Sequence, residues 1–496
     1  MNISVSPEVV ARVRAWIARP RRMLVDGRWL EAGTGAVFDT LDPADGTVLC
    51  AVPRAGAADV DRAVAAARKA FDGAWRKVSP AQRAALMWRL AELLERDREE
   101  LAILETLDNG KPLRVSLGMD VPFAAERLRY NAGWATKIHG ETAPISLPGE
   151  WLGYTVREPV GVVGHIVAWN APLASAVGKL APSLAAGCTM VLKPAEQTPL
   201  SALRLGELIE EAGFPPGVVN IVTGYGEDAG AALAAHPDVD KISFTGSTEV
   251  GRLIVRAAAG NLKRLTLELG GKSPVIVMPD ADLDKAIPGV ANGIFFNSGQ
   301  VCTAGSRLFA HAAVFDELMQ GVAARARALQ VGAGLDPATE IGPLVSKVQQ
   351  DRVEGYIRSG LRDGAETIVG GRTIDRPGYF VEPTILGRTH RDMAVRREEI
   401  FGPVLCAVRF DDAALDALSA EANDTAYGLA AGIFTRDLGA AHKLAARIRA
   451  GTVKINGGGL DQVLPAGGFR QSGWGREYGR EGVEIYTEIK SVLVSL

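Results

Sequence analysis

Cys302 is the first residue of this chain whose type and setting could do chemistry. It follows the small and polar residues 297–301 (Asn-Ser-Gly-Gln-Val) and precedes an apolar run at 308–310. A thiolate is an effective nucleophile near neutral pH, and its pKa falls where backbone N–H groups or cationic partners face it. A free cysteine can equally be a small buried apolar residue. Cys302 is therefore a candidate nucleophile that other residues must support.

Glu268 is a candidate general base, at the end of an apolar run and just before Gly270-Gly271. Partial desolvation at such a place raises the pKa of a carboxyl group toward the working range of a base. The alternative is a surface glutamate in a salt bridge. Gly271-Lys272-Ser273 match the last three residues of the phosphate-loop pattern GxxxxGK[ST], but the first position of that pattern, which needs glycine, is Thr266. Nucleoside triphosphate hydrolysis is therefore not supported.

Alternating strand and helix patterns begin near residue 159 and must position these side chains. Continuous apolar, β-branched strands separated by helices favour an α/β fold with a parallel sheet covered on both faces. Ligands of such sheets bind beyond the carboxyl ends of the strands. We expect strands over 161–168, 189–193, 218–223, 241–245 and 265–269, and helices over 200–212 and 249–259. A second series has strands over 274–277, 307–310, 367–369, 404–410 and 452–455, with helices near 315–329 and 348–360.

The loops after the first strands predict a nucleotide site. Gly246 and Ser247 follow one strand and open a helix, where backbone N–H groups can face a phosphate. Glu196 follows a neighbouring strand and could accept hydrogen bonds from ribose hydroxyls. Residues 224–230 form Gly-x-Gly-x-x-x-Gly, which departs from the strict dinucleotide fingerprint. Each loop could instead be an ordinary turn.

The two ends of the chain are expected to support this arrangement. The first 130 residues favour helices, including one over 59–74 and one that Ser79 caps with Gln82 at its third position, after an extended portion over 23–50. The last residues, Ser-Val-Leu-Val-Ser-Leu, form an apolar strand. Such a strand needs a partner edge from its own chain or from a second subunit.

Composition narrows the class of protein. A chain of 496 residues is too long to fold around one ordinary hydrophobic core, so two or more domains are expected. A net charge of −3, from 55 basic and 58 acidic residues, gives no case for nucleic acid or an anionic membrane surface. Polar and proline residues break the longest apolar region, 160–192, so no membrane span is expected.

Four cysteines in so long a chain do not form a disulfide framework, and the absence of a Cys-x-x-Cys pair gives no metal site. We therefore expect a reducing, cytoplasmic compartment. A small-molecule ligand fits these features better than a macromolecular one.

Seven motifs together resemble those of the NAD(P)-dependent aldehyde dehydrogenase superfamily, from about residue 24 to the end. They are Trp169-Asn170, 193–196 (KPAE), 244–251 (FTGSTEVG), 267–272 (LELGGK), the Cys302 turn, 398–403 (EEIFGP) and 472–477 (SGWGRE). The resemblance implies a Rossmann-type NAD-binding domain over 1–139 and 159–268 and an α/β catalytic domain over 269–470. It also implies a small β oligomerisation element, made of 140–158 and 471–496, in a homodimer or homotetramer.

The chemistry that the resemblance implies suits these residues. Cys302 attacks an aldehyde, and the Asn170 amide and the Cys302 backbone N–H hold the oxyanion of the thiohemiacetal. Hydride transfer to NAD leaves a thioester, which water activated by Glu268 hydrolyses to the carboxylic acid. Lys179 and Glu477 match positions that relay the proton outward.

The resemblance also implies the cofactor site. Lys193 and Glu196 would hold the adenosine ribose, Ser247 the pyrophosphate, and Glu399 with Phe401 the nicotinamide ribose and ring. A carboxylate at 196 would repel a 2′-phosphate, so NAD is expected over NADP. The other implied cofactor-binding residues are Ile166, Trp169, Gly226, Gly230, Phe244, Gly246, Leu269 and Gly270.

The substrate positions depart from the family pattern. Many members carry bulky residues where this chain has Ala171, Ser175 and Gly178, and phenylalanine where it has Ala466. Small residues there predict an enlarged tunnel and a bulky, uncharged aldehyde, aromatic or terpenoid, unless loops around 457–464 fill the space. The expected lining is Ala171, Leu173, Ser175, Gly178, Phe296, Val301, Thr303 and Ala466.

Two other functions compete with this interpretation. A CoA-acylating semialdehyde dehydrogenase would pass the acyl group to a thiol, but retention of the water activator Glu268 argues against it. A non-catalytic structural or binding protein on the same fold is disfavoured because Cys302, Glu268 and Asn170 are all present.

Overall fold

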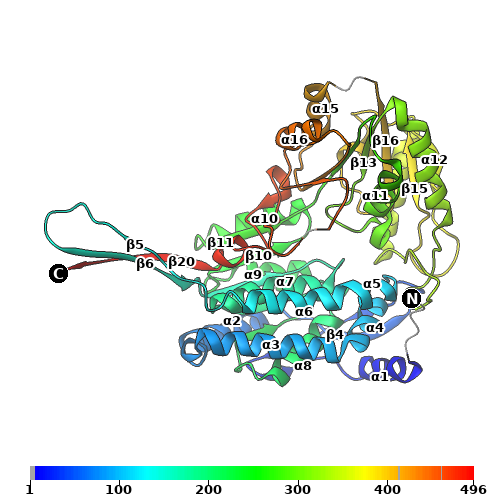
Figure 1. Cartoon of the computed structure of the whole chain (residues 1–496). Helices are drawn as coiled ribbons and strands as arrows, with labels where there is room; N and C mark the ends of the chain where they lie inside the picture. Colours follow the sequence, from blue (N-terminus) through cyan, green and yellow to red (C-terminus); the bar gives the residue numbers. More distant parts are fainter. Residues whose placement is uncertain (1–5, 412–413, 460) are drawn as a thin grey trace.

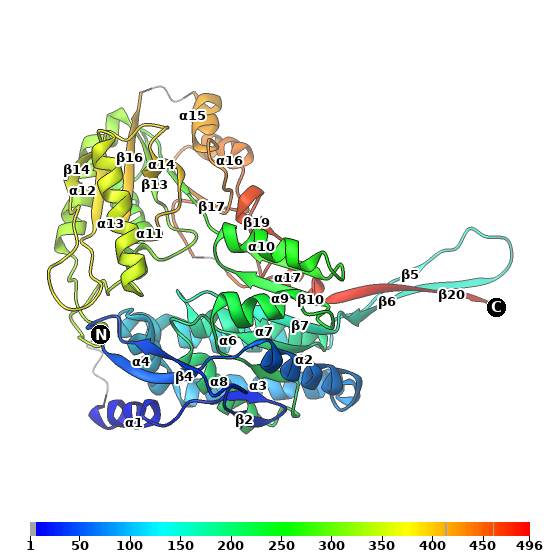
Figure 2. The ribbon, with the colours of Figure 1, turned by 180° about the vertical axis from the view of Figure 1, so that it is seen from behind.

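The structure is a computed structural model that describes residues 6–411, 414–459 and 461–496. Figures 1 and 2 show two lobes, each containing a β-sheet and helices, and a narrow three-stranded sheet that projects from the body. This architecture confirms the predicted α/β fold class. Every helix among the described residues is too short or too polar to span a bilayer.

The first sheet has the strand order β19-β11-β10-β7-β8-β9-β1-β2. Its five central strands are parallel, as predicted, whereas antiparallel strands complete both edges. The strands are β1 (Met23–Val25), β2 (Arg28–Leu30), β7 (Val162–Ile166), β8 (Thr189–Lys193), β9 (Val219–Ile221), β10 (Lys241–Thr245), β11 (Arg264–Glu268) and β19 (Gly473–Trp474). A separate antiparallel pair is formed by β3 (Val37–Leu41) and β4 (Val48–Pro53).

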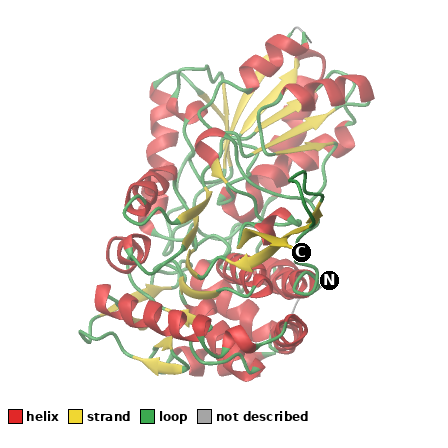
Figure 3. Ribbon diagram, turned by 90° about the vertical axis from the view of Figure 1, so that its left-hand side faces the viewer, coloured by secondary structure: helices red, strands yellow, loops and turns green. Residues whose placement is uncertain are grey.

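The second sheet has the order β14-β15-β16-β13-β12-β17-β18, parallel except for β14. In Figure 3 its strands lie between helices. Its strands are β12 (Pro274–Val277), β13 (Arg307–His311), β14 (Glu366–Val369), β15 (Thr384–Gly387), β16 (Val404–Phe410), β17 (Ala430–Phe434) and β18 (Thr452–Ile455).

The helices bury apolar faces against the sheets and one another. Those of the first half are α1 (Pro7–Ile17), α2 (Ala57–Asp72), α3 (Pro80–Arg96), α4 (Arg98–Asn109), α5 (Leu113–Val115), α6 (Val121–Ala132), α7 (Pro172–Ala186), α8 (Leu200–Ala212), α9 (Ala231–Ala235) and α10 (Thr248–Ala258). Those of the second half are α11 (Leu283–Phe295), α12 (Ala312–Ala328), α13 (Lys347–Arg362), α14 (Ala394–Arg397), α15 (Leu415–Ala422), α16 (Leu438–Arg447) and α17 (Glu481–Glu484).

Local sequence signals account for many of these boundaries. Ser79 Oγ accepts from Gln82 N at 3.3 Å, and the Gln82 side chain accepts from Ser79 N at 2.9 Å, which is the predicted capping box of α3. Helix α12 begins at Ala312, three residues before the predicted start, because the His311 ring nitrogen accepts from Ala313 N at 3.1 Å. The bounds of α8, β8, β10, β12, β16 and β18 are those predicted.

The projecting sheet consists of β5 (Thr142–Ala143), β6 (Trp151–Pro159) and β20 (Thr487–Ser495). Strand β20 pairs with β6 along its whole length, so the apolar terminal strand has a partner edge in its own chain. Strand β19, which precedes it, pairs instead with β11 in the first sheet. The predicted domain boundaries stay a prediction.

A buried charge network anchors the start of α7. Lys111 Nζ lies 2.7 Å from Asp120 Oδ2 and 3.4 Å from Glu105 Oε1, and all three side chains are almost completely buried. The Glu105 carboxylate also accepts from Leu173 N, at 3.2 Å to Oε2, in the first turn of α7. The network therefore fixes the helix that directly follows Asn170.

Replacing Lys111 with methionine should destabilise the protein strongly. The variant leaves two buried carboxylates without their cation, and breaking a buried ion pair costs about 3–5 kcal/mol. The midpoint of thermal unfolding should fall well below that of Lys69→Met, whose ammonium is exposed and pairs with Asp26 at 3.4 Å. Equal midpoints for the two variants would contradict an anchoring role for Lys111.

Candidate active site

The turn that carries Cys302 has an uncommon backbone conformation. Asn297, Ser298 and Gly299 all have positive φ angles, of 50°, 56° and 71°. Residues other than glycine in this region cost about 1–3 kcal/mol each, so the surroundings must hold the turn. Ser298 Oγ donates to Gly342 O at 2.7 Å, and a Cβ at position 299 would overlap the Gly402 carbonyl. The turn is thus held in one shape with Cys302 partly exposed just beyond it.

Gln300 and Asn170 join the turn to the first lobe. The buried Gln300 side chain accepts from Val345 N at 2.9 Å and donates to Asn297 O at 3.2 Å. Asn170 Nδ2 donates to Gln300 O at 2.9 Å, and Asn109 Nδ2 fixes the preceding residue through Trp169 O at 2.7 Å. The structure therefore brings the predicted oxyanion donor beside the predicted nucleophile.

Glu268 ends β11 and is half-buried, and it forms no ion pair with another described residue, so the alternative of a surface ion pair does not hold. Its Oε1 has no hydrogen-bond partner among the described residues. A Cβ at Gly467 would lie only 3.0 Å from this oxygen, so glycine there leaves space beside it. Burial raises the pKa of Glu268 well above its usual range, and the charge of Glu477 raises it further, while Lys179 and Arg476 oppose the shift. A carboxylate whose Oε1 is buried and unpartnered is suited to accept a proton.

Gly271 brings the segment after Glu268 against the turn that bears Cys302. A Cβ at position 271 would overlap the Cys302 carbonyl oxygen, so only glycine allows this approach. Glu268 and Cys302 are near enough that the charge of the carboxylate raises the pKa of the thiol. The candidate base and nucleophile therefore belong to one site.

The Cys302 thiol is protonated in the free protein. Burial raises its pKa to about 12, and the carboxylates of Glu399 and Glu268 contribute next. A backbone hydrogen bond at Thr303 opposes the shift, but the charges that act on the sulfur are negative. A neighbouring base must therefore take the thiol proton as the sulfur attacks.

Lys179 and Glu477 form the predicted pair behind Glu268. The buried Lys179 Nζ donates to Glu477 Oε1 at 2.6 Å and to Ser243 Oγ at 3.0 Å. The backbone of Glu477 bonds reciprocally with Ala466, at 2.7 Å in both directions. Since both charges act on Glu268, the three residues form a series of ionisable groups leading away from it.

Three predicted cofactor residues meet at the carboxyl ends of neighbouring strands. Ile166, the last residue of β7, is in register with Phe244 in β10 and Lys193 in β8. Lys193 Nζ donates to Glu196 Oε2 at 3.0 Å, and a Cβ at Gly230 would lie 3.6 Å from the Lys193 side chain. This is the edge where α/β sheets bind nucleotides.

The next strand end opens a helix. Ser247 caps α10, where its Oγ accepts from Val250 N at 3.2 Å. A Cβ at Gly246 would overlap the Phe244 ring. Free N–H groups in the first turn of α10 suit a phosphate. Gly226 begins the neighbouring turn of residues 226–230.

Glu399 and Phe401 lie where these loops meet the second lobe. Glu399 Oε1 accepts from Gly271 N at 2.9 Å, a Cβ at Gly270 would overlap its carboxylate, and burial raises its pKa. The Phe401 ring meets Trp169 edge-on, 5.1 Å between centroids. Leu269, by contrast, is buried and packs against Gly251. The loops and side chains present fit a dinucleotide that spans from Lys193 to Phe401.

The predicted substrate residues divide into two groups. A cavity of about 380 Å³ is lined by Phe296, Val301 and Thr303, and it is open at Gly293 and at the 457–458 loop. On the other side, Ala171 and Ser175 are half-buried at the start of α7, and Ala466 pairs with Glu477.

Two substrate predictions need correction. Leu173 is 0% exposed and packs in the hydrophobic core, so it has no surface left to line a pocket. The space expected at Gly178 is filled, because a Cβ there would overlap the Arg127 guanidinium. The sequence offered little sign of Arg127, since it lies on a helix 51 positions away in the chain. Only its spacing of four residues from Phe123 hinted at a shared environment.

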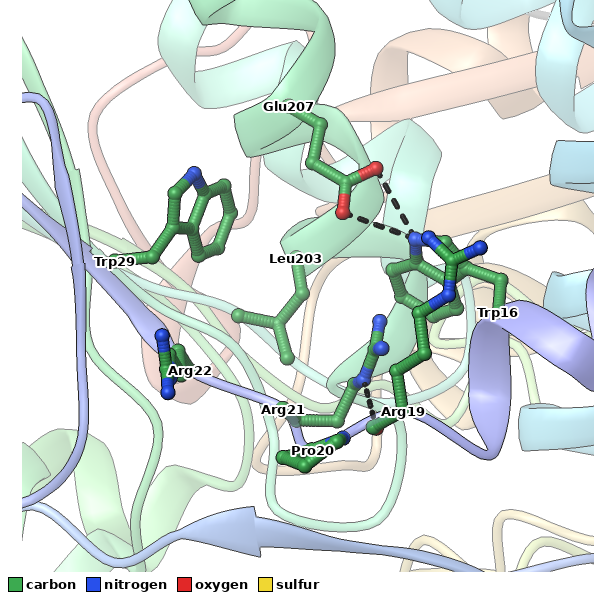
Figure 4. Close-up of a pocket in the computed structure, with 8 residues that line it drawn as sticks. All are labelled: Trp16, Arg19, Pro20, Arg21, Arg22, Trp29, Leu203 and Glu207. Carbon is green, nitrogen blue, oxygen red and sulfur yellow. Dashed lines mark hydrogen bonds between the residues drawn. The ribbon is translucent and has the colours of Figure 1, made fainter.

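A separate surface hollow near the N-terminus contains none of the predicted residues. In Figure 4 the Trp16 ring nitrogen donates to Glu207, at 2.9 Å to Oε1, and the Arg21 guanidinium lies 3.8 Å from the centre of the Trp16 ring. The hollow has no cysteine, serine or histidine in its lining, and its one carboxylate, Glu207, accepts from the Trp16 ring nitrogen. It lies on α1, β2 and α8, apart from the Cys302 turn.

Comparison with known proteins finds a matching family and similar chains of known structure. The family model described as "Aldehyde dehydrogenase family" matches residues 29–492. The chain is 48% identical to the mitochondrial aldehyde dehydrogenase of Rattus norvegicus, over 96% of this chain and 92% of the relative. It is 47% identical to retinal dehydrogenase 2 of Mus musculus over the same shares. The NAD+ complex structure of an aldehyde dehydrogenase from Bacillus cereus superposes with a TM-score of 0.96 at 47% identity, covering 100% of both chains.

Alkylation of Cys302 should report the raised pKa of its thiol. Because only the thiolate reacts, the rate of iodoacetamide labelling in the free protein should rise about tenfold per pH unit from pH 7 to 10, without a plateau. Mass spectrometry of the peptide containing Cys302 gives the rate, and Cys302→Ser identifies labelling at other cysteines. A labelling rate that levels off near pH 7 would mean that the Cys302 thiol is already ionised there, which would contradict its raised pKa.

Proposed function

We propose a mechanism and a substrate class for this chain, which belongs to the aldehyde dehydrogenase family. The chain oxidises an aldehyde to the carboxylic acid with reduction of NAD. Our proposal assigns nucleophilic attack to Cys302 and activation of water to Glu268. The observation that carries it is the buried, unpartnered Glu268 Oε1 beside the Cys302 turn.

In the first half of the proposed reaction the Cys302 sulfur attacks the aldehyde carbon. A water molecule takes the thiol proton to solvent as the sulfur attacks, because burial and nearby carboxylates raise the pKa of the thiol and keep it protonated until then. The Cys302 backbone N–H and the second N–H of the Asn170 amide hold the oxyanion. The first N–H of that amide bonds to Gln300 O at 2.9 Å, which fixes the direction of the second.

In the second half, water releases the acid. NAD held by Lys193, Glu196, Ser247 and Glu399 would supply the hydride acceptor, and loss of the hydride would leave the acyl group on Cys302 as a thioester. Glu268 takes a proton from a water molecule, whose oxygen attacks the thioester carbon as the bond to sulfur breaks and the Cys302 thiolate leaves. The Lys179–Glu477 pair then carries the proton from Glu268 outward, and the thiolate takes up a proton from solvent. Loss of a proton is favoured as pH rises through the raised pKa of Glu268, so hydrolysis should quicken over that range.

The proposed NAD site uses the strand ends of the first sheet. Lys193 and Glu196 hold the adenosine ribose, Gly246 and Ser247 the pyrophosphate, and Glu399 the nicotinamide ribose. The carboxylate of Glu196 favours NAD over NADP, because a 2′-phosphate would meet a negative charge. The other residues of the proposed site are Ile166, Trp169, Gly226, Gly230, Phe244, Leu269, Gly270 and Phe401.

The proposed substrate is a bulky aldehyde with an aromatic or branched apolar body. Ala171 and Ser175 leave room on α7, and the cavity beside Phe296, Val301 and Thr303 offers about 380 Å³. A relative named as a retinal dehydrogenase, at 47% identity, agrees with a large apolar substrate. These observations favour bulk over an acetaldehyde-sized substrate.

A panel of aldehydes of increasing size tests the substrate class. With NAD, benzaldehyde and a branched terpenoid aldehyde should have higher kcat/KM than acetaldehyde. Ala171→Phe should lower kcat/KM for the bulky substrates by about tenfold or more relative to acetaldehyde, because a ring would occupy their space. The proposal fails if short aliphatic aldehydes have the highest kcat/KM in the unmodified enzyme.

We also propose that the chain forms a homodimer or homotetramer through the projecting sheet. Strand β20 is an edge strand, and Ile489 and Leu493 on it are 61% and 50% exposed. Exposed apolar residues on a long edge strand are typical of surfaces that meet another subunit. The proposed oligomerisation element comprises 140–158 and 471–496.

Replacing the exposed apolar residues of β20 with charged ones should separate the subunits. Ile489→Asp with Leu493→Asp should reduce the mass measured by light scattering to that of one chain, 52.4 kDa. Val348→Asp changes an even more exposed apolar residue, on α13, and should leave the mass unaltered. A monomeric unmodified protein at micromolar concentration would contradict the proposed assembly.

We infer a reducing, cytoplasmic compartment from the thiols. All four cysteines are free, and Cys188 and Cys406 are buried without a disulfide partner.

A further inference from the structure

Arg127 occupies the place where the sequence predicted an empty substrate pocket. It projects from α6, is 5% exposed, and its Nη1 donates to Ala174 O on α7. A Cβ at Gly178 would overlap the same nitrogen. A larger side chain at 178 and the guanidinium at this place exclude each other, so glycine is what admits the cation.

The guanidinium lies against two aromatic rings. Its central carbon is 4.2 Å from the centre of the Phe123 ring and 4.5 Å from that of Tyr478. Each ring face attracts a cation. Tyr478 follows Glu477, so the cation also lies beside the segment that bears the predicted proton relay.

Arg127 lacks the partner that a buried cation normally has. No carboxylate of the described chain lies within ion-pair distance of it, and its Nε has no hydrogen-bond acceptor among those residues. Burial lowers its pKa to about 10, while Glu477 and Asp120 oppose this from farther away, so it stays charged at neutral pH. An unpaired buried charge costs several kcal/mol, which an incoming acceptor would offset.

The position of Arg127 relates it to the substrate. Residues 171, 175 and 178 repeat at three- and four-residue spacing and so share one face of α7. Arg127 contacts that helix at Ala174 and Gly178, beside the small residues proposed to line the substrate site. Because Nη1 bonds to the helix and Nε is fully buried, Nη2 is the nitrogen left for another acceptor. Its N–H groups suit a carboxylate or another oxygen acceptor.

We propose that Arg127 is a specificity-determining residue that selects bulky aldehydes bearing an oxygen acceptor, best a carboxylate, at the end remote from the aldehyde. This inference rests on the proposed substrate site and refines it, since the body of the substrate stays bulky and apolar while its far end carries the oxygen. A purely space-filling arginine would confer no such preference.

Two aldehydes of matched shape test this role. 4-Formylbenzoate and 4-isopropylbenzaldehyde differ in whether the branched para group accepts hydrogen bonds. The unmodified enzyme should favour the benzoate in kcat/KM. A hydrogen bond to a charged group corresponds to roughly ten- to a hundredfold in preference, so Arg127→Met should lower the ratio of the two values by about that factor. The ratio within one variant is independent of the fraction of active enzyme.

Two further variants separate charge from structure. Arg127→Lys keeps the cation without the paired donors and should restore part of the ratio. Arg129→Met removes a neighbouring arginine on α6 that pairs with Glu95 at the surface, and it should keep the ratio of the unmodified enzyme.

A ratio at or below one in the unmodified enzyme overturns the proposal even if Arg127→Met does not fold, and so does an unchanged ratio in Arg127→Met. Failure of the broader substrate proposal would look different, since both benzaldehydes would then be slower than acetaldehyde while their ratio still reported on Arg127.

Discussion

The close approach of Gly271 to the Cys302 carbonyl is the contact on which the site depends. Strand β11 of the first sheet ends at Glu268, and the segment after it contacts, through Gly271, the turn that precedes β13 of the second sheet. Any side chain at 271 would push the two apart. The Asn170 amide adds a second link through Gln300 O, so nucleophile, oxyanion donor and base are held across the junction of two lobes. Each lobe supplies chemistry that the other lacks.

Burial of carboxylates sets the chemistry of this junction. Burial raises the proton affinity of Glu268 and Glu399, and both then raise that of the Cys302 thiol. A protonated thiol is protected from adventitious alkylation and oxidation, because these reactions need the thiolate. Deprotonation is thereby tied to a moment when a base and a substrate carbonyl are both present. Lys179 on α7 is buried against Glu477, and its positive charge opposes the rise in the pKa of Glu268.

The sequence was most informative where a signal was local. Strands such as β8 and β10 are short apolar runs between Gly and Pro loops, and Ser79 caps its helix through neighbours three residues away, so both could be predicted. The family motifs predicted which residues gather at the junction. The sign of the Cys302 pKa shift was not accessible, because it depends first on burial of the sulfur and then on Glu399, which is distant in the chain.

Side-chain packing across helices was equally hidden from the sequence. Leu173 is apolar and adjacent to lining positions, yet the turn of α7 directs it into the core. Gly178 is small, yet the space beside it belongs to Arg127 on another helix. An empty space beside a small residue can therefore be predicted only when the side chains that face that residue are known. Here the facing group is charged, which changes the character of the wall as well as its size.

Rapid mixing of Glu268→Gln with NAD and an aldehyde tests the central claim, that Cys302 carries the acyl group and Glu268 activates the water that releases it. We predict a burst of about one NADH per subunit followed by a stall, with the acyl mass found on the peptide containing Cys302. Cys302→Ala should give neither burst nor adduct. Sustained turnover of Glu268→Gln at the unmodified rate, or an adduct on another residue, would contradict the account.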